Sequence, residues 1–61
     1  MYEKYVELRD SRGISDYRVS EETGITKSTF SDWKNGRSIP KIEKLKILAD
    51  YFGVDINYFI E

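Results

Sequence analysis

The segment spanning residues 14–36 constrains the fold most, because two short helix signals meet there at a single glycine. Ser15 is a residue type that caps the N-terminus of a helix, and Gly24 stands where that helix should end. A left-handed backbone conformation is expected at Gly24, since only glycine adopts it without strain. Thr26 then offers a second N-cap immediately after the turn. The pattern predicts two helices joined by a tight turn, over residues 15–23 and 26–34.

The second of these helices has two unlike faces. Phe30 and Trp33 stand three residues apart on one face, with Ile25 above them on the turn. The opposite face carries small polar and charged residues, namely Lys27, Ser28, Ser31 and Asp32, with Thr29 at its edge. Aromatic side chains can also stack on nucleic-acid bases, but this spacing favours burial in a core. We therefore expect the aromatic face to be buried and the polar face to point outward.

Three further helices are predicted around this pair. Apolar residues at helical spacing indicate a helix over residues 2–12, in which Tyr5 and Leu8 should face the core. Pro40 suits the first turn of a helix over residues 40–52. Asp55 can cap a short helix that ends at residue 60 (residues 55–60). The apolar stripe expected to supply most of the core is Ile42, Leu45, Leu48, Ala49 and Phe52.

Composition bounds the class of protein. The 61 residues allow one domain, spanning residues 1–61, and an apolar share of 39% suits a compact globule. The chain has no cysteine and no histidine, and its acidic residues are scattered on predicted helix surfaces. These features argue against an enzyme, a metal site or a cofactor, and the lack of cysteine fits the cytoplasm. The charged N-terminus and the absence of a long apolar run argue against a membrane partner.

Positive charge is confined to one stretch. The net charge of −1 argues mildly against a nucleic-acid partner. Residues 1–23 hold four basic and six acidic side chains, a net charge of −2, and residues 47–61 hold three acidic side chains, a net charge of −3. Residues 24–46 hold six basic and two acidic side chains, a net charge of +4. A surface that faces DNA would need such a positively charged stretch. The alternative explanation of this charge is that the lysines only keep the surface solvated.

The order of small, apolar, glycine and proline positions resembles that of the lambda repressor/Cro family, also called the xenobiotic-response-element family. The matching pattern is S-x-x-x-V-S-x-x-x-G-I-T-x-S-T-F-S-x-W-x-N-G over residues 15–36, then Pro40, then I-x-x-L-x-x-L-A-x-x-F-G-V over residues 42–54. The resemblance covers about residues 5–60. It implies an all-α bundle of five short helices with a central helix-turn-helix. It also implies a prokaryotic or phage transcription regulator, with repression as the expected role, that binds double-stranded DNA as a dimer.

The resemblance assigns expected roles to individual positions. The residues expected to face base edges are Lys27, Ser28, Thr29, Ser31 and Asp32. Lys27 can donate to guanine, and Asp32 can accept from cytosine N4. The residues expected to face phosphates are Asn35, Arg37, Ser38, Lys41 and Lys44, although Lys44 could serve solubility alone. An ordinary solvated helix surface remains the alternative for each of these side chains.

Two departures from the family pattern concern charge. The family often has Gln at the start of the second helix, where it touches a phosphate, but this chain has Asp16, which would repel one. The Glu that commonly follows the Trp position pairs with an Arg of the first helix, but this chain has Lys34 there. Arg9 must therefore find another carboxylate or point to solvent.

The C-terminal third holds more apolar residues than the predicted core face needs. We expect these residues to form a homodimer interface: Ile47, Tyr51, Ile56, Tyr58 and Ile60. Incidental exposure is the alternative, since isolated apolar residues are common on surfaces. A second hypothesis for the whole chain is a protein-interaction module, such as an antitoxin-like partner domain, that keeps the fold with weak or no DNA binding.

Overall fold

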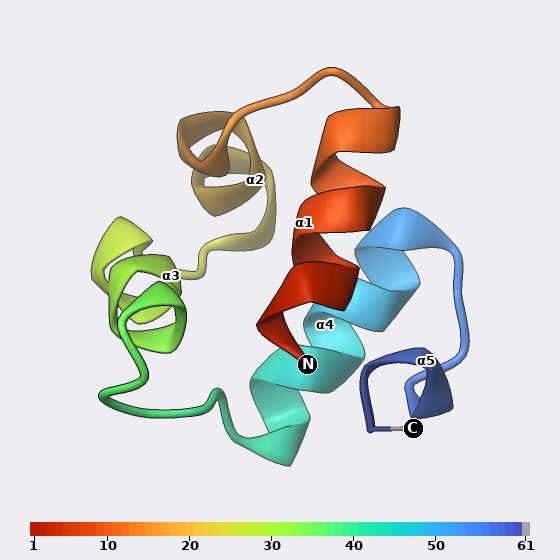
Figure 1. Ribbon diagram of the computed structural model, residues 1–61. Helices are drawn as coiled ribbons and strands as arrows, with labels where there is room; N and C mark the ends of the chain where they lie inside the picture. Colours follow the sequence, from red (N-terminus) through yellow and green to blue (C-terminus); the bar gives the residue numbers. More distant parts are fainter. Residues whose placement is uncertain (61) are drawn as a thin grey trace.

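The computed structural model describes residues 1–60, which form five helices and no strand. The helices are α1 (Tyr2–Ser11), α2 (Asp16–Thr23), α3 (Lys27–Lys34), α4 (Ile42–Phe52) and α5 (Asn57–Ile60). Figure 1 shows α1 and α4 near the centre, with α2 and α3 to one side and α5 to the other. The expected all-α, five-helix architecture is confirmed. No helix within residues 1–60 has the length and apolar character needed to cross a membrane.

The helix ends follow from local backbone chemistry. The Ser15 hydroxyl accepts a hydrogen bond from the Arg18 amide at 3.2 Å, which confirms its capping role. Gly24 has φ +81°, and its amide donates to the Ser20 carbonyl at 2.9 Å, so this glycine ends α2 in the left-handed conformation. The Asp55 carboxylate accepts from the Asn57 amide at 2.8 Å, just before α5.

The predicted start of one helix is wrong, and that of another is confirmed in position but without the expected side-chain bond. Pro40 is buried in the loop before α4 and is not a first-turn residue, because Lys41 still has an extended backbone (φ −71°, ψ 165°) and α4 begins at Ile42. Thr26 occupies the N-cap position of α3, but its side chain makes no capping bond to an amide. Its hydroxyl instead lies 3.0 Å from the Ser28 hydroxyl and 3.1 Å from that of Thr29.

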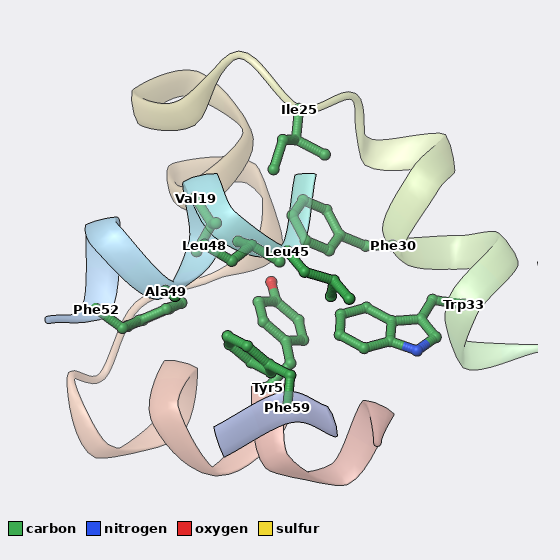
Figure 2. Packing of buried hydrophobic residues seen from close by; sticks show 10 residues of the cluster. All are labelled: Tyr5, Val19, Ile25, Phe30, Trp33, Leu45, Leu48, Ala49, Phe52 and Phe59. Carbon is green, nitrogen blue, oxygen red and sulfur yellow. The ribbon is translucent and has the colours of Figure 1, made fainter. Parts of the chain in front are cut away.

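One aromatic side chain of α1 lies at the centre of the core (Figure 2). The Tyr5 ring stacks on Phe30 at a centroid distance of 4.8 Å and on Trp33 at 5.6 Å. It meets Phe52 of α4 edge-on at 6.2 Å. The buried residues around it are Val19, Ile25, Phe30, Trp33, Leu45, Leu48, Ala49, Phe52 and Phe59, and Leu8 packs half-buried against this cluster. Burying such side chains contributes about 1.5–3 kcal/mol each, which makes this cluster the main source of stability.

Ile42 does not belong to this core, contrary to the sequence prediction. Its side chain is 56% exposed, whereas Leu45, one turn later, is 5% exposed. Ile42 is the first residue of α4, and the buried residues of this stripe begin one turn later, at Leu45.

The difference between these two residues of α4 can be measured. Leu45→Ala should lower the free energy of unfolding by about 2–5 kcal/mol, because it leaves a cavity in the core. Ile42→Ala should change it by less than about 1 kcal/mol, because the side chain is largely in water already. Urea denaturation followed by circular dichroism measures both values. Equal losses in the two variants would contradict the described core.

Candidate nucleic-acid interface

The burial of two aromatic residues orients α3. Phe30 and Trp33 are 1% and 4% exposed, so one face of the helix is held against the bundle. On the other face Lys27, Ser28 and Ser31 are exposed, and Thr29 and Asp32 are half-buried. The structure therefore brings all five residues expected to face base edges onto one short helix. The outward polar face that the sequence predicts is present.

Tyr17, which is not among the residues expected to contact DNA, lies beside the start of α3. The Lys27 ammonium lies 5.4 Å from the centroid of the Tyr17 ring, a cation–π arrangement. The Tyr17 hydroxyl donates to the Glu21 carboxylate at 2.9 Å, which fixes the ring on the surface of α2. Tyr17 is 57% exposed. The sequence held one signal for this contact. Tyr17 is a large aromatic residue in the first turn of α2, at a position that does not face the core.

The five residues expected to face phosphates are all exposed, and they lie at the end of α3, in the loop that follows and in the first turn of α4. Two of them already have partners. The Asn35 side-chain amide donates to the Ser31 carbonyl at 2.9 Å. The Arg37 guanidinium lies 3.4 Å from the Asp32 carboxylate. Ser38, Lys41 and Lys44 extend the exposed polar surface beyond the helix.

The two charged departures from the family pattern compensate each other. Arg9 finds the carboxylate that it needs in Asp16, with Nη1 3.0 Å from Oδ1. The same Asp16 oxygen accepts the Tyr5 hydroxyl at 2.5 Å, and Asp10 lies 3.0 Å from the other end of the guanidinium. Asp16 is therefore turned toward α1, and Arg9 balances its charge. Lys34, in the position of the family's Glu, is exposed.

This arrangement perturbs the tyrosine. Burial, and then the hydrogen bond to the Asp16 carboxylate, raise the pKa of the Tyr5 hydroxyl well above its ordinary value. Ionisation of Tyr5 would place a second negative charge against Asp16 inside the bundle. The hydroxyl therefore remains a proton donor throughout the neutral range.

The residues expected to form a dimer interface fall into two groups. Ile47 and Ile60 are exposed, at 42% and 51%. Tyr51, Ile56 and Tyr58 are half-buried and pack against the core, so they are not surplus apolar surface. The Tyr51 hydroxyl also donates to Glu22 on α2, and the Tyr58 hydroxyl donates to Glu7 on α1 at 3.2 Å. Ile47 and Ile60 are therefore the large apolar side chains of this set that stand open to solvent.

Within residues 1–60 there is no group of three or more metal-ligating side chains.

A sequence model described as helix-turn-helix matches residues 7–59, nearly the whole chain. The chain belongs to the lambda repressor/Cro-type helix-turn-helix family. In this family the α2–turn–α3 unit is the helix-turn-helix, and Gly24 stands in its turn.

Two curated relatives of this helix-turn-helix domain are transcription regulators by name. It is 32% identical over 53 residues to the cryptic phage CTXphi transcriptional repressor RstR of Vibrio cholerae, covering 87% of this chain and 48% of the relative. It is 27% identical over 55 residues to the HTH-type transcriptional activator BcrR of Enterococcus faecalis, covering 90% of this chain and 27% of the relative. The chain thus spans about half of one relative (48%) and about a quarter of the other (27%). No solved structure matched the chain.

The perturbed tyrosine gives a test by pH. Because the folded-state pKa of Tyr5 lies above its unfolded value, its contribution to stability is complete below about pH 10 and is lost as the pH rises further. The free energy of unfolding should fall by roughly 1.4 kcal/mol per pH unit from this group once the unfolded state ionises.

Tyr5→Phe should remove this part of the alkaline dependence, and chemical denaturation at pH 9, 10 and 11 measures the difference between the variants. The result that contradicts the arrangement is an identical pH dependence for both proteins.

Proposed function

We propose that this helix-turn-helix domain binds double-stranded DNA and regulates transcription, with α3 in the major groove. The observation that carries the proposal is the burial of Phe30 and Trp33, which leaves a rigid helix with only small polar and charged residues outward. An α-helix fits the major groove, and residues at its N-terminus and one turn later reach base edges. The two relatives named as transcription regulators support the same role.

The roles of the individual side chains follow from their places on α3. Lys27 begins the helix and can donate to guanine O6 and N7. Ser28 and Ser31 can donate or accept, and Thr29 can contact a thymine methyl group. Asp32, one turn beyond Ser28, completes the polar face.

Phosphate contacts would come from the loop after α3 and the start of α4. Asn35, Arg37, Ser38, Lys41 and Lys44 are exposed there. They belong to the stretch of residues 24–46, whose six basic and two acidic side chains give a net charge of +4. Such contacts set the register of α3 on the duplex and make binding depend on salt concentration.

Dimerisation would supply affinity that one domain with few phosphate contacts lacks. We propose a homodimer in the cytoplasm that acts as a repressor, as the name of RstR suggests. Its interface would lie around the exposed Ile47 and Ile60, and the half-buried Tyr51, Ile56 and Tyr58 would add their exposed edges to it. Half-sites would then lie about one helical turn of DNA apart.

Selection of bound sites from random DNA tests the reading helix. Lys27→Ala should relax the preference at one defined base pair, because each good side-chain contact to a base contributes roughly 1–3 kcal/mol of discrimination. Lys4→Ala is the matched loss of charge, since Lys4 lies on α1 and its ammonium lies 5.4 Å from the ring of Tyr58 on α5. It should leave the selected sequence unchanged.

Two outcomes would count against this function. Uniform weakening by Lys27→Ala, with no change in base preference, would reduce that residue to a backbone contact. No mobility shift on mixed DNA even at low salt would favour the protein-interaction module, which the overall net charge of −1 also suits.

Sedimentation velocity tests the dimer. Ile47→Ser and Ile60→Ser should each shift the population toward monomer, because each removes apolar area from the proposed interface. Ile39→Ser is the matched control, since Ile39 is 62% exposed and lies in the loop before α4. A wild-type domain that sediments as a monomer at high micromolar concentration would refute the interface.

A further inference from the structure

The backbone at the end of α3 forms a Schellman motif, which determines where the side chain of Arg37 lies. The Arg37 amide donates to the Asp32 carbonyl at 2.8 Å, and the Gly36 amide donates to the Trp33 carbonyl at 3.2 Å. Gly36 has φ +72°, the left-handed conformation that this motif requires. In such a motif the residue two positions past the C-cap comes back beside the last turn of the helix. Arg37 is therefore placed next to Asp32 by the main chain.

Two other helices of the bundle end in the same way but carry a different side chain there. The Ile14 amide donates to the Arg9 carbonyl at 3.3 Å after α1, and the Val54 amide donates to the Ala49 carbonyl at 2.9 Å after α4. Both Ile14 and Val54 are apolar and pack against the core, which is the usual contact of this motif. At the end of α3 the equivalent residue is Arg37, and an ion pair with Asp32 at 3.4 Å replaces the apolar contact.

Stability does not account for this ion pair. The side chains of Arg37 and Asp32 are 70% and 40% exposed. Ion pairs exposed to this degree contribute little to folding, since water and salt screen them. Asp32 nevertheless stands on the face of α3 proposed to enter the groove, where an unpaired carboxylate would be repelled by phosphates. Arg37 balances that charge and, with five donors on its guanidinium, can bind Asp32 and still donate to DNA.

We propose that Asp32 is a positioning residue for Arg37, and that it affects DNA recognition through Arg37 instead of accepting from a base. The inference rests on the proposed DNA binding of α3 and assigns this carboxylate a role different from the cytosine contact expected from sequence. Asp32 holds the guanidinium at the C-terminal end of the reading face. Arg37 then contacts a phosphate from a set position, which helps to fix the register of the helix.

A double-mutant cycle tests the inference. The variants are Asp32→Asn, Arg37→Gln and the double variant, compared with the unaltered domain. Affinity is measured by fluorescence anisotropy on a duplex recovered by selection from random DNA and on a mixed-sequence duplex, each over a range of salt concentrations.

Asp32→Asn should lower the ratio of the affinity for the selected duplex to that for the mixed duplex about threefold or more, as expected for side chains that act as one unit. Arg37→Gln should lower the salt slope by about 1, as expected for one lost phosphate contact. In the Arg37→Gln background, Asp32→Asn should have no further effect on the affinity ratio.

Each alternative outcome is distinct. If Asp32→Asn lowers the affinity ratio by the same factor in both backgrounds, the carboxylate acts on the selected sequence without Arg37 and the inference is wrong. If Asp32→Asn has no effect in the unaltered background, Asp32 does not position Arg37. If the domain binds neither duplex at low salt, the proposed function itself fails, and the inference fails with it. The side chains of Arg37 and Asp32 are 70% and 40% exposed, so circular dichroism should show an unchanged fold in each variant.

Discussion

The structure depends most on the burial of the Tyr5 ring against α3 and α4. Its faces stack on Phe30 and Trp33 of α3, and its edge meets Phe52 of α4. Its hydroxyl reaches Asp16, the first residue of α2. One side chain of α1 thus contacts three other helices, and two of those contacts hold the aromatic face of α3. The outward polar face of α3 is a consequence of that packing.

The Arg9–Asp16 pair shows how two charged departures from the family pattern offset each other in this chain. The family's usual partner for the arginine of the first helix is absent, since Lys34 stands in its place. Asp16, which taken alone would disfavour a phosphate contact, supplies the missing carboxylate at 3.0 Å. It also accepts the buried tyrosine hydroxyl, which would otherwise lose a hydrogen bond on folding. The two departures, each unfavourable by itself, form one network between α1 and α2.

The sequence was sufficient for the parts of the fold that local chemistry determines. Helical spacing predicted the buried face of α3, and Gly24 predicted the turn, because each signal lies within a few residues of its effect. The sequence predicted Ile42 in the core and Pro40 in the first turn of α4, and both were wrong, because the exact start of a helix depends on how its end meets the bundle. The partners of Arg9, Asp32 and Lys27 could not be predicted, because side-chain pairing between elements requires their relative placement. For the same reason, Tyr51, Ile56 and Tyr58 were expected to be surplus, although they pack against the core.

The central claim is that the polar face of α3, with the loop that follows it, is the surface that meets DNA. Nuclear magnetic resonance of the ¹⁵N-labelled domain during titration with a selected duplex tests this claim most directly. If this surface meets DNA, the largest amide shift changes should fall between Lys27 and Lys44, with small changes in α1 and α5. Changes concentrated in α1 and α5, or no change at low salt, would contradict it.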